Sequence, residues 1–186
     1  MLILASASPR RRDLLTQAGL RFDVLPAHID ESLRLNESPT QYVERLALEK
    51  ALTLHHLHPT ATILGADTTV VLDNEILNKP VDLADAERML RALSGHTHQV
   101  HTGIAVVTPT TRLTHVETTN VFFSTIPADE LNHYLSTGDS LDKAGAYGIQ
   151  GYAARWITRI EGDFFNVMGL PIAATLQLLR SVMPFS

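Results

Sequence analysis

The chain has 186 residues, of which 45% are hydrophobic and 19% charged, and its formal net charge is −5. This composition is typical of a globular protein and excludes a disordered or fibrous one, while the acidic balance argues against non-specific binding of nucleic acid. Because the sequence contains no cysteine, it also excludes disulfides, thiolate nucleophiles and zinc held by cysteine.

The sequence predicts no membrane segment. No apolar run approaches the roughly 20 residues that a membrane span needs, and the apolar residues 1–5 are too few for a signal peptide. The lack of cysteine fits a reducing compartment. We therefore expect a cytoplasmic protein with neither a membrane nor a nucleic acid as its partner.

Short apolar runs alternate with helical segments, and this pattern predicts an α/β fold. In chain order we expect a strand at 2–5, a helix at 9–18, a strand at 22–25, a helix at 39–57, strands at 62–72 and 75–77, a helix at 83–93, strands at 98–107 and 113–125, a helix at 127–135, a strand at 155–160 and a helix at 170–182. These elements predict a mixed, twisted sheet flanked by helices, in two lobes around a cleft.

The first predicted helix begins with three consecutive arginines. Ser8 is a good N-cap, and Pro9 suits the first helical position. Arg10, Arg11 and Arg12 then fall in the first turn, where the partial positive charge of the helix disfavours cations. A polyphosphate held by backbone N–H groups, serine hydroxyls and guanidinium groups would offset this repulsion. A solvated basic face explains the run equally well.

Lys50 interrupts the apolar stripe of the long helix, which starts with a capping box formed by Ser38 and Gln41. Lys50 lies at helical spacing from both Leu46 and Leu54, which belong to that stripe. A lysine in this place must either reach an anion or extend its amine to solvent at the rim. Both interpretations stay open at this point.

Asp67 lies within an otherwise apolar strand pattern at residues 63–72. A carboxylate there needs a cation or several hydrogen bonds, and Gly65 and Ala66 are expected to keep the approach open for a ligand. A metal-bound carboxylate or a general base fits this position. An aspartate that caps a turn at the end of one strand is the alternative.

Three further places carry weaker signals. Residues 142–151 contain three glycines at a spacing of three, which suits a close approach to a ligand but also an ordinary glycine-rich loop. Lys79 precedes a predicted helix and could present a cation to the cleft. Asp30 and Glu31 could reach a metal ion. The side chains of Lys79, Asp30 and Glu31 could equally belong to plain solvated loops.

Seven segments of the chain, in this order, resemble the Maf family of nucleotide pyrophosphatases. The matching strings are LASASPRRRDLL at 4–15, ERLALEKA at 44–51, LGADTTV at 64–70, LNKP at 77–80, LSGHTHQVHTG at 93–103, DKAGAYGIQG at 142–151 and GDFFNVMGLP at 162–171. Because the resemblance covers nearly the whole chain, it implies a single domain over residues 1–186.

The resemblance implies an enzyme that hydrolyses a nucleoside triphosphate to the monophosphate and pyrophosphate with a divalent metal ion, Mg²⁺ or Mn²⁺. It also implies a fold similar to that of inosine triphosphate pyrophosphatases. Asp67 matches the catalytic proton acceptor and, with Glu31, is expected to bind the metal. The residues expected to bind phosphate are Ser6, Arg10, Arg11, Lys50 and Lys79.

Three positions separate the branches of this family, and here they hold Arg10, Thr68 and Gln150. This combination resembles the branch that acts on dTTP and UTP. The branch for 7-methyl-GTP carries a tryptophan after Ser-Pro and a glutamate in the glycine loop. An amide such as that of Gln150 can pair with both donors and acceptors of a pyrimidine.

Two rival hypotheses remain open. One is an enzyme of the same fold with another choice of base, such as house-cleaning of non-standard nucleotides. The other is a non-enzymatic, nucleotide-binding regulator of septum formation or cell division, which the family's name suggests. The resemblance also implies a homodimer.

Overall fold

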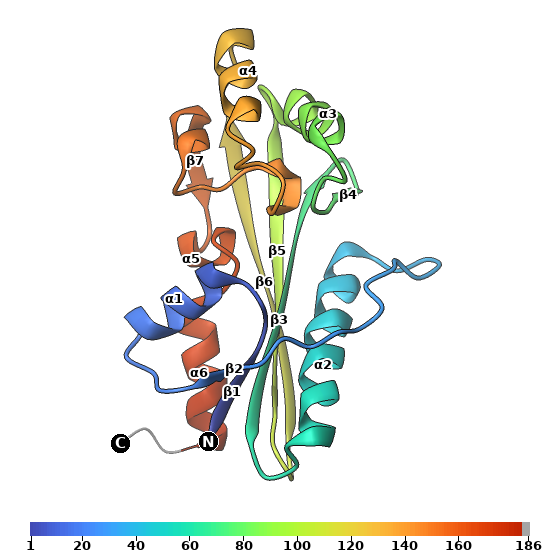
Figure 1. Ribbon diagram of the computed structural model, residues 1–186, viewed down its shortest axis with the longest axis vertical. Coiled ribbons are helices and arrows are strands. Elements are labelled where there is room, and N and C mark those ends of the chain that lie inside the picture. The colour runs from blue at the N-terminus through green and yellow to red at the C-terminus, as the bar shows by residue number, and fades with distance from the viewer. Residues whose placement is uncertain (184–186) are drawn as a thin grey trace. The chain divides into compact units, whose positions relative to one another are not determined.

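The computed structural model describes residues 1–183, so the expected domain of residues 1–186 extends beyond the described part. The elements, shown in Figure 1, are β1 (Leu2–Ala5), α1 (Pro9–Gln17), β2 (Asp23–Val24), α2 (Pro39–Leu57), β3 (Thr62–Leu72), β4 (Glu75–Leu77), α3 (Leu83–Leu93), β5 (Thr97–Val107), β6 (Arg112–Phe123), α4 (Ala128–Ser136), the 3₁₀ helices η1 (Ala144–Ala146) and η2 (Tyr152–Trp156), β7 (Ile157–Glu161), α5 (Phe164–Val167) and α6 (Ile172–Val182). Within residues 1–183, no helix is both long enough and apolar enough to cross a membrane.

The strands form one mixed sheet, as predicted. Its order is β2-β1-β3-β5-β6-β7, and β4 also pairs with β3. β1 runs parallel to both β2 and β3, whereas β4 is antiparallel to β3 and β7 is antiparallel to β6. β5 and β6 are neighbours joined by a short turn in which Thr108 N–H donates to the Thr111 carbonyl at 2.9 Å, and only antiparallel strands can be joined so directly. The predicted α/β fold is therefore confirmed.

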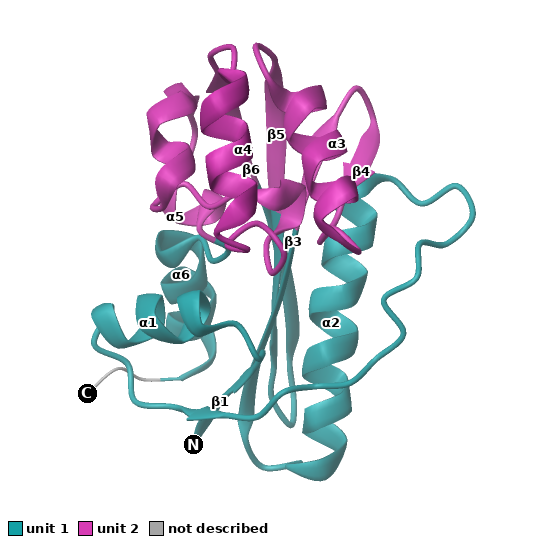
Figure 2. Ribbon diagram, turned by 45° about the horizontal axis from the view of Figure 1, so that its top comes forward, with its two compact units in different colours: residues 1–68, 102–117, 169–186 teal, residues 69–101, 118–168 magenta. Residues whose placement is uncertain are grey.

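The chain divides into two compact units, coloured separately in Figure 2. Unit 1 comprises residues 1–68, 102–117 and the chain from 169 onward, and unit 2 comprises residues 69–101 and 118–168. β3, β5 and β6 each contribute residues to both units. The expected single domain and the expected cleft stay predictions.

In unit 1, α2 lies on one side of the strands, and α1 and α6 lie on the other (Figures 1 and 2). Two glycines let the backbone of α2 approach the strands closely. A Cβ atom on Gly65 of β3 would lie 2.1 Å from the Ala47 carbonyl oxygen, and one on Gly103 of β5 would lie 2.3 Å from that of Val43. The expectation that Gly65 leaves room for a ligand is therefore wrong, because α2 fills that space.

The start of α2 follows from its capping box. The Ser38 hydroxyl accepts a hydrogen bond from Gln41 N–H at 3.3 Å, and the Gln41 side chain accepts one from Ser38 N–H at 3.0 Å. The predicted helix at 39–57 is confirmed. β3 and β4 are joined by a tight turn, in which Asp73 and Asn74 both have positive φ angles, 49° and 68°.

Short elements depart from the predictions. The expected strand at 22–25 is reduced to Asp23–Val24, and the expected strand at 155–160 begins at Ile157 because residues 152–156 form η2. The sequence predicted neither 3₁₀ helix, nor the four-residue helix α5. Such short segments carry too few residues for a hydrophobic period to be recognisable.

Candidate functional site

Two carboxylates of unit 1 meet at the Lys50 ammonium group. Lys50 Nζ lies 2.7 Å from Asp67 Oδ1 and 2.7 Å from Glu31 Oε1. The side chains of Lys50 and Asp67 are only 10% and 12% exposed, whereas that of Glu31 is 55% exposed. Lys50 therefore does not extend to solvent at the rim. It joins a buried carboxylate to one at the surface.

Helix α2 brings these groups together. Gly65 and Asp67 lie two residues apart on β3 and so share one face of the strand. A Cβ on Gly65 would contact the backbone of both Ala47 and Ala51, which bracket Lys50 on α2. At the start of the same helix, the Tyr42 hydroxyl donates to the Glu31 carbonyl at 2.9 Å and anchors the segment that carries Glu31.

The surroundings of Asp67 make its carboxylate a stronger base than an exposed one. Burial raises the pKa of Asp67, and the positive charges of Lys50 and Arg11 oppose this rise without cancelling it. A general base works best when its pKa approaches the operating pH. The direction of this shift suits a proton acceptor, but that role of Asp67 stays a prediction.

Most of the N–H donors of the Arg11 side chain are hydrogen-bonded to other residues of unit 1. Its Nε donates to the Gly169 carbonyl at 2.7 Å, and its Nη1 donates to the Ala66 carbonyl at 2.9 Å and to the Ser6 hydroxyl at 3.1 Å. Its Nη2 donates to the Thr68 hydroxyl at 2.9 Å. Burial lowers the pKa of Arg11, but a guanidinium group stays charged. Phosphate binding by Arg11 and Ser6 stays a prediction.

The three consecutive arginines have different environments. Arg11 is buried, Arg10 is half-buried, and Arg12 is exposed, with an ion pair to Asp13 at 3.1 Å. Ser8 caps the helix as predicted, through a 3.5 Å hydrogen bond from Arg11 N–H. The run is therefore not a uniformly solvated basic face, because its middle member lies inside the protein.

The Thr68 hydroxyl belongs to the same buried network. It accepts from Arg11, shares a 2.9 Å hydrogen bond with the Thr102 hydroxyl, and lies 3.4 Å from the Gly169 carbonyl. A role of Thr68 in base selection stays a prediction. Sequence reasoning missed Thr102, Gly169 and Tyr42, and the only signal was that Thr102 and Gly169 fall within the quoted motif strings.

Two predicted site residues, Lys79 and Gln150, lie in unit 2, and both are exposed. In the glycine-rich loop around Gln150, packing within the protein requires at least one of the glycines. Gly145 has a φ of 66°, and a Cβ there would lie 2.8 Å from the Val70 side chain. Close approach within the protein therefore accounts for Gly145 without a ligand.

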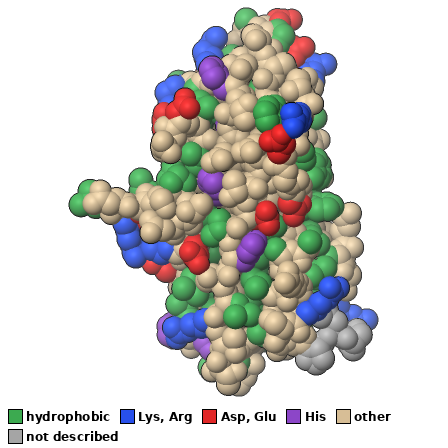
Figure 3. Space-filling model, turned by 180° about the vertical axis from the view of Figure 1, so that it is seen from behind, with side chains coloured by type: hydrophobic (Ala, Val, Ile, Leu, Met, Phe, Trp, Pro, Cys, Tyr) green, Lys and Arg blue, Asp and Glu red, His purple; other side chains and the backbone are tan. Residues whose placement is uncertain are grey.

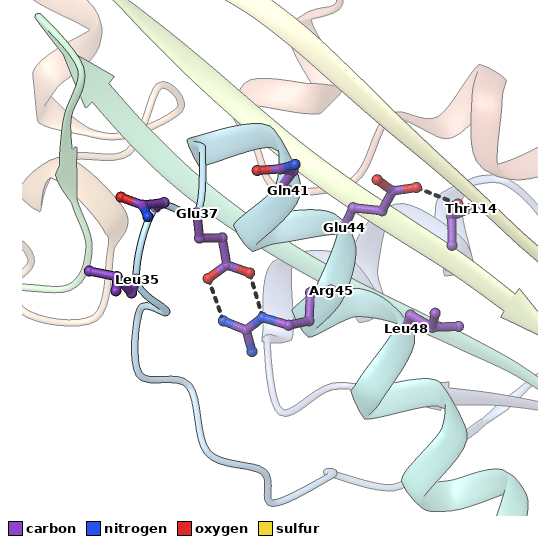
Figure 4. A pocket seen from close by; sticks show the side chains of 8 residues that line it. Leu35, Glu37, Gln41, Glu44, Arg45, Leu48 and Thr114 are labelled. Carbon is purple, nitrogen blue, oxygen red and sulfur yellow. Dashed lines mark hydrogen bonds and ion pairs between the residues drawn. The ribbon is translucent and has the colours of Figure 1, made fainter.

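An open pocket of about 500 Å³ lies beside the start of α2 in unit 1 (Figure 4). It is lined by Leu35, Asn36, Glu37, Gln41, Glu44, Arg45, Leu48 and Thr114. Its charged groups are engaged, since Arg45 binds Glu37 at 2.5 and 2.7 Å and Thr114 donates to Glu44 at 2.6 Å. The segment before α2 projects from the surface and ends in hydrophobic side chains (Figure 3). Leu35, which lines the pocket, is 92% exposed. No predicted site residue lines this pocket.

Asp67 and Glu31 suit a hard divalent cation. Both carboxylates bind Lys50 Nζ and therefore lie close together, so a metal ion held by them would lie beside this ammonium group and not in its place. Mg²⁺ is commonly held by one or two carboxylates together with substrate phosphates. Residues 1–183 contain no group of three or more His, Asp or Glu side chains placed to hold a metal, so phosphate or water oxygens would have to complete the coordination.

A model of the Maf-like protein family matches residues 1–182. A protein named dTTP/UTP pyrophosphatase from Koribacter versatilis is 51% identical over 179 residues, which cover 96% of this chain and 93% of that protein. One of the same name from Geobacillus is 49% identical over 179 residues, 96% of each chain. The crystal structure of protein VC0702 from Vibrio cholerae aligns with 75% of this chain and 73% of its own at a TM-score of 0.37 and 11% identity, too weak a likeness to support any argument. The resemblance of the motif strings is thus confirmed, and the chain belongs to the Maf-like protein family.

Proposed function

We propose that this protein hydrolyses dTTP and UTP to the nucleoside monophosphate and pyrophosphate. The observation that carries the proposal is the buried Asp67 carboxylate bound to Lys50, in a chain about half identical to two proteins named dTTP/UTP pyrophosphatase. A buried carboxylate with a raised pKa is typical of a catalytic group, whereas a regulator that only binds nucleotides has no proton to transfer.

In the proposed reaction, Asp67 orients a water molecule and accepts its proton as the water oxygen attacks the α-phosphorus. The bond from the α-phosphorus to the bridging oxygen breaks, and pyrophosphate leaves with the electron pair. Lys50 holds the Asp67 carboxylate at 2.7 Å and so limits its motion before the attack.

A divalent cation, Mg²⁺ or Mn²⁺, is proposed to bind at Asp67 and Glu31. When bound, it would supply positive charge to the phosphate oxygens. The protein itself would add the cationic groups of Arg10, Lys50 and Lys79 and the partial charge at the start of α1. The buried charge of Arg11 would contribute its field even with most of its donors engaged.

Base selection is proposed to depend on Arg10, Thr68 and Gln150. Thymine and uracil present an acceptor, O4, where cytosine presents an amino donor, N4. A side-chain amide can supply the matching donor. Discrimination between bases should then reach about 10- to 100-fold, because one bidentate pair is worth about 1–3 kcal/mol.

The test is release of pyrophosphate from dTTP, UTP, dCTP, CTP, GTP, ATP and 7-methyl-GTP by the wild-type protein, with Mg²⁺ or Mn²⁺. We expect dTTP and UTP to have the highest kcat/KM and the monophosphate to appear in equal amount with pyrophosphate. Turnover of another base in preference would instead support house-cleaning of non-standard nucleotides. Activity without added metal in the presence of a chelator would contradict the metal proposal.

A cytoplasmic location and a homodimer are proposed on the sequence and the family resemblance alone. Cell fractionation tests the first, and sedimentation equilibrium of the purified protein tests the second. A monomer at micromolar concentration would contradict the dimer without affecting the proposed reaction.

A further inference from the structure

A buried histidine and a buried tyrosine are joined inside unit 2. His98 of β5 is 2% exposed and Tyr147 is 5% exposed, and His98 Nε2 lies 2.7 Å from the Tyr147 hydroxyl. Phe123 packs edge-on against both rings, with ring centres 4.9 Å from each. The pair is therefore buried against an aromatic ring, and its two polar groups bind one another.

Retaining a histidine in this place has a cost that an apolar residue would avoid. The other ring nitrogen, Nδ1, is buried and has no hydrogen-bond partner among residues 1–183. An unsatisfied buried polar group typically costs about 1–3 kcal/mol. Among residues 1–183, the hydrogen bond to Tyr147 is thus the one hydrogen bond that the His98 ring makes. This single contact indicates that His98 serves to position Tyr147.

The pair stays uncharged over the range in which enzymes usually work. Burial lowers the pKa of His98 to about 3 and raises that of Tyr147 above its ordinary value. With a neutral imidazole, donation from the tyrosine hydroxyl to Nε2 leaves fewer unsatisfied groups than the reverse arrangement. The hydrogen bond between His98 of β5 and Tyr147 of the glycine-rich loop should consequently not change when the pH varies around neutrality.

Tyr147 lies in the middle of the loop that carries Gln150. At its start, the Lys143 ammonium binds the carboxylates of Asp139 at 2.9 Å and Asp142 at 2.6 Å. A Cβ on Gly148 would lie 2.9 Å from the Lys143 side chain, so the chain folds closely over that lysine.

Just beyond Tyr147, Gly151 N–H donates to the Gly148 carbonyl at 3.1 Å. Gln150 itself is exposed and sits within this short turn. The position of its backbone therefore depends on the neighbouring anchors, which include the buried side chain of Ile149 and, three residues before Gln150, the hydrogen-bonded hydroxyl of Tyr147.

We infer that His98 and Tyr147 are positioning residues that hold the loop carrying Gln150 and thereby control discrimination between pyrimidine bases. The inference rests on the proposed function, in which Gln150 contacts the base. Neither residue needs to touch the nucleotide. The hydrogen bond acts by limiting the range of positions open to Gln150, so its loss should reduce selectivity more than the turnover of the preferred substrate.

The test compares Tyr147→Phe, Gln150→Ala and the double variant with the wild-type protein. Tyr147→Phe removes only the hydroxyl and keeps the ring that packs on Phe123. The measured quantity is the ratio of kcat/KM for dTTP to that for dCTP, together with amide hydrogen exchange over residues 142–151. Tyr134→Phe is the matched control, because Tyr134 is also a buried tyrosine of unit 2 but belongs to α4.

We expect Tyr147→Phe to lower the selectivity ratio about tenfold, the scale of one lost hydrogen bond, and to speed exchange over residues 142–151. The double variant should be no less selective than Gln150→Ala alone. Selectivity equal to that of Tyr134→Phe, or additive losses in the double variant, would overturn the inference. A wild-type protein that hydrolyses no triphosphate would overturn the proposed function, and the exchange rates would then show separately whether Tyr147 holds the loop.

Discussion

The side chain of Arg11 binds the backbone of β3 just beyond the point where β1 ends. β1 pairs with β3 as far as Ala5 and Gly65, and the next carbonyl of β3, Ala66, accepts a hydrogen bond from Arg11. The same guanidinium binds the Gly169 carbonyl, so it joins β3 to the chain that leads into α6. Hydrogen bonds from a charged donor are stronger than those between neutral groups.

We expect Arg11→Met to lower the free energy of unfolding by about 3 kcal/mol, because several buried acceptors lose their donor. Arg12→Met is the control. Its side chain is 55% exposed and its ion pair with Asp13 is solvated, so the change should stay within about 0.5 kcal/mol. Urea unfolding of both variants checks this. Equal stabilities of the two variants would contradict the structural role of Arg11.

The sequence could indicate three arginines at a helix start but not which of them points inward. Arg10, Arg11 and Arg12 are chemically identical, and only packing against β3 and Gly169 separates them. Asp67 and Lys50 were predictable singly, because each interrupts an apolar pattern. Their pairing was not, since it depends on the distance between a helix and a strand.

The distance between Lys50 and Asp67 depends on how secondary-structure elements pack, and above all on how closely α2 approaches β3. Its residues were predictable to both ends, since a capping box starts it and an apolar stripe runs through it. How closely α2 packs against the strands was not predictable. Gly65 and Gly103 admit the helix backbone to the strands, and a glycine within a strand signals a close approach without naming the partner.

Gly65→Ala should therefore displace α2 from β3. The added Cβ would lie 2.1 Å from the Ala47 carbonyl oxygen, and overpacking of this kind costs about 1–3 kcal/mol. We expect lower stability and a fall in kcat/KM as Lys50 moves away from Asp67. Gly151→Ala is the stability control, because its φ is −94° and its nearest neighbour would lie at 3.4 Å. Unchanged stability in Gly65→Ala would refute the close-packing explanation.

On the scale of the whole chain, the predicted site residues divide between the two units. Unit 1 holds Ser6, Arg10, Arg11, Glu31, Lys50, Asp67 and Thr68, whereas unit 2 holds Lys79 and Gln150. The boundary on β3 falls directly after Thr68. A motif order in sequence cannot reveal this division, because it arises from long-range pairing of strands that run through both units.

Each unit has its own core, and that of unit 2 should make the protein sensitive to acid. His98 stays neutral in the fold with a pKa of about 3, whereas in the unfolded chain it takes up a proton below its ordinary value of 6.5. The stability that depends on neutral His98 is therefore present above pH 6.5 and is lost as the pH falls toward 3.

For one such group, the free energy of unfolding should fall by about 1.4 kcal/mol per pH unit across this window. His98→Gln should remove that part of the slope, since glutamine takes up no proton and its amide oxygen can still accept from Tyr147. Urea unfolding at several pH values measures it, with the exposed His133→Gln as control. Parallel curves for His98→Gln and the wild type would contradict the buried, neutral state of His98.

The most direct test of the central claim is the rate of pyrophosphate release from dTTP by Asp67→Asn, measured beside the wild type and the exposed control Asp13→Asn. If Asp67 is the general base, its loss should lower kcat by about 10²- to 10⁴-fold while Asp13→Asn keeps the wild-type rate. Wild-type turnover by a folded Asp67→Asn protein would contradict the assignment of hydrolysis to the Lys50–Asp67 site.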